Sequence, residues 1–152
     1  MPTPRICCVD ASIIVRLLID RADRPVQTLW RSWQEEAVMI TAPALLLYEV
    51  TNALYLQQRQ GVFSEQAVEL MIATARLLPI RLVADSGLHR EAHRIASDLG
   101  LPATYDAHYL ATAVRDGAML WTSDKKLVTS IGGKLGRVRY VPRKDEAADS
   151  LR

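Results

Sequence analysis

The sequence has no hydrophobic stretch long enough to cross a membrane. Its apolar runs extend for only a few residues, whereas a transmembrane helix needs about 20. The one apolar run near the start, residues 6–9, is broken by Asp10 and does not form the hydrophobic part of a signal peptide. We therefore expect a cytoplasmic protein without a membrane segment.

Cysteine and aromatic residues are also scarce. The two cysteines, Cys7 and Cys8, are adjacent, and in a strand their side chains would point to opposite faces. They therefore cannot easily form a disulfide or hold one metal ion together, and we expect buried thiols in a reducing compartment. Aromatic residues make up 6% of the chain. Trp30, Trp33 and Trp121 could stack on nucleic-acid bases, but their spacing favours core or dimer contacts.

Short apolar segments alternate along the chain with segments of helical periodicity. The 152 residues suffice for one domain that buries about 70% of its unfolded surface. We expect strands over residues 6–9, 38–41, 80–83, 118–122 and 138–141. We expect helices over residues 11–20, 25–36, 43–60, 64–78, 85–100, 105–115 and 124–131. This alternation predicts an α/β domain over residues 1–142, with a parallel sheet covered on both faces, and a frayed polar tail over residues 143–152.

Four acidic residues occupy positions that such a fold would bring together. Asp10 follows the first predicted strand and Asp124 follows the fourth, so both lie at carboxyl ends of strands, where α/β folds bind ligands. Glu49 and Asp106 interrupt helical segments that are otherwise apolar. Converging carboxylates repel one another, and a divalent cation is the simplest compensation. The pattern therefore predicts a metal-dependent hydrolytic site.

Each acid also has a structural interpretation when it is taken alone. Asp10 and Asp106 could cap helices or interact with helix dipoles, and Glu49 could belong to a solvated helix face. The joint order of the acids favours a shared site over separate structural roles. Polar residues accompany three of the four acids: Ser12, Asn52 and Thr122.

Basic residues gather in the C-terminal third, although the formal net charge is only +2. From Lys125 onward they outnumber the acidic residues, which there are Asp145, Glu146 and Asp149. A basic segment beside an acidic cluster suits a site that attracts a polyanion and cleaves it. An ordinary solvated surface would have the same composition. The candidate phosphate contacts are Lys125, Lys126, Arg137 and Arg139.

A longer pattern connects the four acids. It comprises Asp10 with Ser12, Glu49 with Asn52 and Leu54, Tyr105-Asp106-Ala107 with Tyr109-Leu110-Ala111, and Gly117, Leu120, Thr122, Asp124 and Leu127. With these residues in this order, the chain resembles the PIN-domain ribonucleases, and among them the VapC-type toxins of bacterial toxin–antitoxin pairs. The resemblance covers essentially the whole chain, and no acidic position of the pattern is missing.

The resemblance implies a three-layer α/β/α sandwich around a parallel sheet, and endonucleolytic cleavage of RNA with Mg²⁺ or Mn²⁺. The implied metal ligands are Asp10, Glu49, Asp106 and Asp124, and their implied polar support is Ser12, Asn52 and Thr122. A homodimer and a cognate antitoxin that blocks the site are also implied. The metal suits this chemistry because it lowers the pKa of a bound water and neutralises phosphate oxygens. One ion or two would fit four carboxylates.

Two other functions remain open. A non-catalytic RNA-binding or interaction module could keep the same fold, although the presence of all four acids disfavours it. A phosphohydrolase with an aspartyl nucleophile is disfavoured because Asp10-Ala11-Ser12 lacks a second Asp two residues on. His89 and His93 do not form a zinc-protease motif, since no Glu follows His89 directly. We expect them on a solvated helix face, and we expect no catalytic role for His108.

Overall fold

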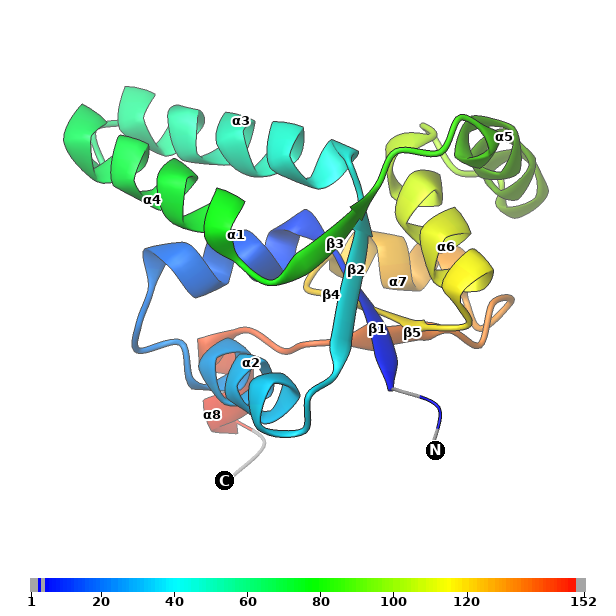
Figure 1. Ribbon diagram of the computed structural model, residues 1–152, viewed down its shortest axis with the longest axis horizontal. Coiled ribbons are helices and arrows are strands. Elements are labelled where there is room, and N and C mark those ends of the chain that lie inside the picture. Colours follow the sequence, from blue (N-terminus) through cyan, green and yellow to red (C-terminus); the bar gives the residue numbers. More distant parts are fainter. Residues whose placement is uncertain (1–2, 4, 150–152) are drawn as a thin grey trace.

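The structure is a computed structural model that describes residue 3 and residues 5–149. Over this part of the chain, strands and helices alternate as the sequence predicts (Figure 1). The strands are β1 (Ile6–Val9), β2 (Met39–Pro43), β3 (Ile80–Val83), β4 (Met119–Thr122) and β5 (Val138–Tyr140). The helices are α1 (Ala11–Ile19), α2 (Arg24–Glu35), α3 (Leu45–Arg59), α4 (Glu65–Leu77), α5 (Gly87–Leu99), α6 (Tyr105–Asp116), α7 (Lys125–Ile131) and α8 (Lys144–Asp149). No helix within the described residues is both long and apolar enough to cross a membrane.

The strands form one parallel sheet in the order β3-β2-β1-β4-β5. Helices α1 to α4 lie on one side of this sheet, and α5, α6 and α7 lie on the other (Figure 1). Right-handed crossovers require this division, because the chain winds outward from β1 to β3 and then from β4 to β5 in the opposite direction. The predicted three-layer α/β/α sandwich is therefore confirmed. The winding reverses between β1 and β4, and α/β folds bind ligands at the carboxyl ends of strands at such a point.

The central strand β1 is buried on both faces, which explains its continuous apolar sequence. Cys7, Cys8 and Val9 are all buried there. Both thiols are free, as expected, and burial raises the pKa of Cys7 to about 12 and that of Cys8 well above its ordinary value. A thiol with such a high pKa is a poor nucleophile and a poor metal ligand at neutral pH.

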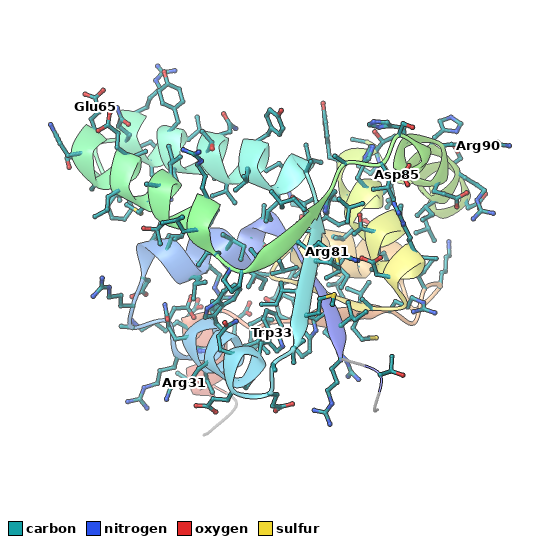
Figure 2. The ribbon with its side chains drawn as sticks, in the orientation of Figure 1. Arg31, Trp33, Glu65, Arg81, Asp85 and Arg90 are labelled. Carbon is teal, nitrogen blue, oxygen red and sulfur yellow. The ribbon has the colours of Figure 1, made fainter. Side chains whose placement is uncertain are left out.

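The tryptophans connect α2 to the sheet. Trp33 is buried, and its ring meets that of Trp121 on β4 edge to face, with centroids 5.6 Å apart. Trp30 meets Trp33 in the same way at 6.1 Å. Figure 2 shows Trp33 between α2 and the sheet. The expected core role is confirmed for these rings, because edge-to-face pairs of this kind stabilise an apolar interior.

Two expectations about element bounds were wrong. Pro43 ends β2 instead of beginning a helix, because the chain stays bonded to β3 through the Ala44 amide, which donates to the Val83 carbonyl at 2.8 Å. The segment after Pro142 is not frayed, since residues 144–149 form α8. Glu146 fixes this helix by accepting hydrogen bonds from the Tyr140 hydroxyl at 2.6 Å and the Arg143 amide at 3.0 Å. The rest of the predicted tail, residues 150–152, lies outside the described residues.

Candidate active site

Asp10 lies at the switch point, where β1 ends and α1 begins. Its amide donates to the Trp121 carbonyl of β4 at 3.0 Å, and its side chain is 7% exposed. One carboxylate oxygen, Oδ2, accepts from Ser12 Oγ at 2.6 Å, from Thr122 Oγ1 at 2.9 Å and from the Ser12 amide at 3.4 Å. None of the ion pairs among the described residues includes Asp10. Burial raises its pKa, and the hydroxyl bonds act against that rise.

The two hydroxyls that bind Asp10 also hold the loop between β4 and α7. Ser12 Oγ accepts from the Ser123 amide at 2.9 Å, and Thr122 Oγ1 accepts from the Asp124 amide at 3.0 Å. Each hydroxyl has a single proton, which it donates to Asp10, so only its lone pairs remain for the two amides. Ser12 and Thr122, two of the three predicted supporting residues, thus both contact Asp10.

Asp124 is the N-cap of α7. Its Oδ1 accepts from the amides of Lys126 at 2.9 Å and Leu127 at 3.2 Å. Asp10 likewise caps α1. The capping interpretation and the shared-site interpretation are therefore compatible, because a capping carboxylate uses one oxygen and keeps its charge.

Glu49 is bound by Tyr109, a residue of the longer pattern to which the sequence analysis gave no role of its own. Its Oε1 accepts from the Tyr109 hydroxyl at 2.6 Å, and the Tyr109 side chain is fully buried on α6. Burial raises the pKa of both groups, so the phenol remains a donor. Tyr109 lies one turn after Asp106, so both side chains lie on the same side of α6. This spacing is the signal that could have identified Tyr109 as a link between α6 and α3.

The pKa of Asp106 depends on the other three acids, which indicates that the four acids lie near one another. Burial and the charges of Asp10, Asp124 and Glu49 together raise the pKa of Asp106 from 3.8 to about 6. Burial is the larger cause, and the contribution of the three charges requires that these acids lie near enough to repel Asp106. Across the described residues, however, no three His, Cys, Asp or Glu side chains are placed closely enough to hold a metal ion as they stand.

The remaining predicted residues differ in their distance from the acids. Asn52 is exposed on α3, one turn after Glu49. Lys125 and Lys126 begin α7 directly after Asp124. Arg139 lies on β5 opposite Trp121.

Arg137 precedes β5, and its carbonyl accepts from the Leu120 amide at 2.7 Å. Arg137 therefore lies beside the amino-terminal end of β4, whereas Asp10 and Asp124 follow the carboxyl ends of their strands. Lys125 forms an ion pair with Glu146, and its Nζ lies 5.9 Å from the centroid of the Tyr140 ring. Lys126 takes part in none of the ion pairs within the described residues. Lys126 is therefore the candidate phosphate contact that lies close to Asp124 in the chain and has no ion pair among the described residues.

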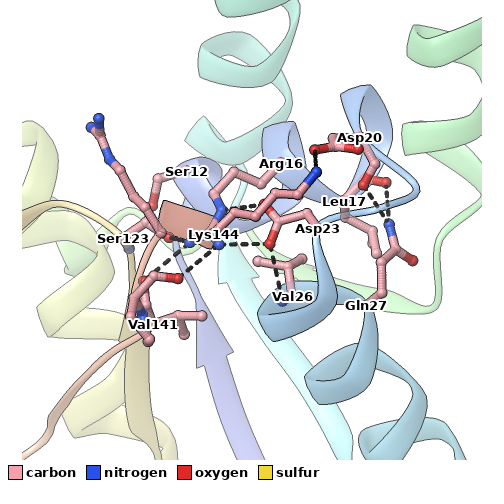
Figure 3. Close-up of polar contacts among 12 residues, drawn as sticks. Ser12, Arg16, Leu17, Asp20, Asp23, Val26, Gln27, Ser123, Val141 and Lys144 are labelled. Carbon is pink, nitrogen blue, oxygen red and sulfur yellow. Dashed lines mark hydrogen bonds and ion pairs between the residues drawn. The ribbon is translucent and has the colours of Figure 1, made fainter. Parts of the chain in front are cut away.

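Arg16 forms a second polar network behind the acids, and the sequence analysis did not find it (Figure 3). Its guanidinium donates to both carboxylate oxygens of Asp23 at 2.7 Å. It also donates to Ser123 Oγ at 2.7 Å, to the Val141 carbonyl at 3.1 Å and to the Pro142 carbonyl at 2.8 Å. The Arg16 and Asp23 side chains are only 14% and 8% exposed. This pair ties α1 and α2 to the β4–α7 loop and to the chain after β5.

The raised pKa of Asp106 predicts how the stability of the metal-free protein depends on pH. Between about pH 4 and pH 6 the folded state keeps a proton that the unfolded state has released. This group therefore stabilises the fold below about pH 4, relative to neutral pH, and that contribution is lost as the pH rises through about 6. We expect Asp106→Asn to have a larger free energy of unfolding than wild type at pH 7, and we expect this difference to shrink toward pH 4. Urea unfolding in the presence of EDTA measures it.

The matched control is Asp98→Asn, on the exposed surface of α5. The difference in free energy of unfolding between Asp98→Asn and wild type should not grow from pH 4 to pH 7 in this way. A margin for Asp106→Asn that stays constant from pH 4 to pH 7 would contradict the raised pKa.

Comparison with solved structures shows what the fold resembles. PAE2754 from Pyrobaculum aerophilum is 24% identical, with a TM-score of 0.66 over 91% of this chain and 90% of that one. A toxin–antitoxin complex from Klebsiella pneumoniae contains a chain 18% identical, with a TM-score of 0.61 over 88% of this chain and 95% of that one. VapC20 of Mycobacterium tuberculosis, a toxin that cleaves the sarcin–ricin loop, is 19% identical, with a TM-score of 0.57 over 82% of this chain and 94% of that one.

No curated protein sequence matches the chain. The PIN domain family model matches residues 7–129, which extend from β1 through most of α7 and include all four acids. The match therefore covers the sheet reversal, the helices on both faces and the carboxylates described above. This chain belongs to the PIN domain family.

Proposed function

We propose that this protein is a metal-dependent endoribonuclease and the toxin of a type II toxin–antitoxin pair. The observation that carries the proposal is the placement of the acids at the switch point. Thr122 binds both the Asp10 carboxylate and the Asp124 amide, and Tyr109 joins Glu49 to α6, the helix of Asp106. Burial and the charges of the other three acids together raise the pKa of Asp106. PIN domains are generally nucleases, and VapC20, a toxin with this fold, cleaves RNA. The alternative, a non-catalytic module, does not explain why these charges are kept together.

The donor set fits a divalent cation. Carboxylate oxygens are the hard ligands that Mg²⁺ and Mn²⁺ prefer. Asp10 is buried and has no ion pair among the described residues, so a cation would offset both the cost of burying its charge and its repulsion of Asp106. Mg²⁺ keeps several of its water molecules, so the ion need not contact every carboxylate directly. Asp10, Glu49, Asp106 and Asp124 would hold the ion, which would supply an activated water and neutralise charge on the phosphate.

The chain itself contributes positioning and charge. Asp10 is fixed by Ser12 and Thr122, and Glu49 is oriented by the Tyr109 hydroxyl. In the metal-free protein, burial and the neighbouring acids raise the pKa of Asp106 to about 6. A bound cation would favour the ionised form of Asp106, which is the form that can hold the ion. We assign the supporting roles to Ser12, Thr122 and Asn52.

The partners follow from the same proposal. Toxin–antitoxin complexes share this fold, which supports a cognate antitoxin as a partner. We also propose RNA as substrate and a homodimer as the assembled form. Light scattering of the purified protein measures the assembly, and growth after induced expression measures toxicity.

Removing one metal ligand should abolish cleavage while preserving the fold. We expect Asp124→Asn to lose Mg²⁺- or Mn²⁺-dependent cleavage of a cellular RNA pool and to lose growth arrest on expression. Asp98→Asn, on the exposed surface of α5, changes the same functional group and should cleave as wild type does. If wild type binds RNA but cleaves none with either ion, the protein is a binding module and not a nuclease.

A specific metal site should also appear in thermal stability. Because the ion would bind the folded state only, stability should rise by about 2.7 kcal/mol at one hundred times the dissociation constant. Melting curves in Mg²⁺ or Mn²⁺ should shift upward relative to EDTA, and Asp10→Asn should reduce the shift. The same shift in NaCl at matched ionic strength would show general charge screening, not a site.

Among the proposed phosphate contacts, Lys126 allows the sharpest test. One lost contact should weaken binding of single-stranded RNA and flatten the slope of log K against log salt concentration by about 0.7. Lys134→Ala is the matched control, because Lys134 is exposed in the loop after α7. Equal affinities and equal slopes for Lys126→Ala, Lys134→Ala and wild type would assign Lys126 to the ordinary surface. The same measurement on Lys125, Arg137 and Arg139 ranks the other three.

A further inference from the structure

We propose that a hollow beside the four carboxylates binds one unpaired base of the RNA. This inference rests on the proposed ribonuclease function and adds a subsite to it. The hollow has a volume of about 360 Å³ and lies at the carboxyl ends of β2 and β3, which contribute Pro43 and Val83. Its walls include Tyr48 of α3 and Tyr105 of α6, and we call it the aromatic hollow.

The two tyrosines expose aromatic faces next to the acids. Tyr48 is 76% exposed and Tyr105 is 62% exposed, and neither ring packs against another aromatic ring in the part of the chain that the structure describes. Tyr48 directly precedes Glu49, and Tyr105 directly precedes Asp106. Consecutive Cα atoms are about 3.8 Å apart. The hollow at the ends of β2 and β3 and the acids after β1 and β4 lie at the same edge of the parallel sheet, so we expect one nucleotide chain to contact both.

The floor of the hollow is apolar and its edge is polar. Leu45 and Leu88 line it together with the two strand ends. Its one carboxylate, Asp85 (Figure 2), forms an ion pair with Arg115 at 2.8 Å. Its charge is thereby compensated, so the hollow does not repel a polyanion as the metal-free acids do. An aromatic and apolar surface with few polar groups is the usual lining of a site for a small planar ligand.

Two histidines provide the polar edge. His89 is exposed as expected, but its Nδ1 lies 3.0 Å from Nε2 of His108, and both residues line the hollow. His108 Nδ1 lies 2.7 Å from the Thr104 carbonyl, which can only accept, so Nδ1 carries the proton. In the neutral pair, His108 Nε2 therefore accepts from His89 Nδ1. This leaves Nε2 of His89 as an acceptor for an amine or ring N–H of a base.

These features favour an unpaired base over the other occupants of an apolar hollow. Proteins recognise RNA mainly through bases that are splayed out of a helix and stacked on aromatic rings. A volume of about 360 Å³ is near the lower limit of small-molecule sites, about 300–1,000 Å³. It is too small for a peptide helix. A base bound in the hollow would thus give a role to the rings of Tyr48 and Tyr105, which are largely exposed to solvent.

The test is RNA binding in a background that cannot cleave. The parent protein is the Asp124→Asn variant. Adding Tyr48→Ala or Tyr105→Ala to this parent should weaken its binding of a short single-stranded RNA homopolymer by about 5- to 150-fold for at least one of the bases. Tyr48→Phe and Tyr105→Phe keep the ring and should bind like the parent. Tyr55→Ala is the matched control, because Tyr55 is 50% exposed on the same helix as Tyr48 and does not line the hollow.

An oligonucleotide with one abasic position gives an independent measure. Moving the abasic position along the strand should reveal one position at which base removal weakens binding to the parent but not to Tyr48→Ala. Affinities of Tyr48→Ala and Tyr105→Ala within twofold of Tyr55→Ala would overturn the proposal. So would a change from dimer to monomer in these variants with unchanged RNA affinity, which would assign the hollow to a protein contact.

The same experiments separate this inference from the nuclease proposal. If wild type cleaves RNA and the tyrosine variants bind normally, only the subsite is wrong. If wild type cleaves nothing and the tyrosine variants bind more weakly, the subsite stands and the nuclease proposal fails. Absence of any RNA binding overturns both.

Discussion

The buried carboxylate of Asp10 is the constraint on which this end of the molecule depends. A carboxylate transferred from water to the interior costs several kcal/mol unless its charge is compensated. Two hydroxyls and one amide donate hydrogen bonds to the Asp10 carboxylate. Each hydroxyl then also accepts from an amide of the β4–α7 loop. The need to satisfy one anion therefore fixes the backbone that carries Asp124, although β1 and β4 are far apart in the sequence.

The β4–α7 loop is held from a second direction by Arg16. This side chain, with Asp23 as its bidentate partner, donates to Ser123 Oγ, while the Ser123 amide donates to Ser12. The two networks thus meet at a single residue between Thr122 and Asp124. Preorganised charges of this kind do not have to reorganise when a reaction occurs, which is the property that electrostatic catalysis requires. Glu49 and Asp106, on α3 and α6, are only half-buried and are held by fewer bonds.

The sequence predicted the features that depend on local pattern. Apolar runs and helical spacing predicted the strands and helices, and the acids at strand ends indicated where a candidate site would lie, because side-chain periodicity and the rule on carboxyl ends need no tertiary information. It did not predict Arg16–Asp23, Tyr109–Glu49 or His89–His108. These pairs join different elements, and nothing in the spacing of one element indicates its partner. Helix α8 was missed for the same reason, since its anchor, Glu146, acts through Tyr140.

The site so described is unsuited to bind RNA by its acids alone. The charges of Asp10, Asp124 and Glu49, which together with burial raise the pKa of Asp106, attract a cation and repel a phosphate. Under the proposed function, affinity for RNA in the absence of metal would therefore come from residues beside the acids, with Lys126 contacting a phosphate and the aromatic hollow holding a base. A bound ion would then make the acidic centre attractive to phosphate. On this proposal, binding and cleavage depend on different residues of one surface, so that one can be lost without the other.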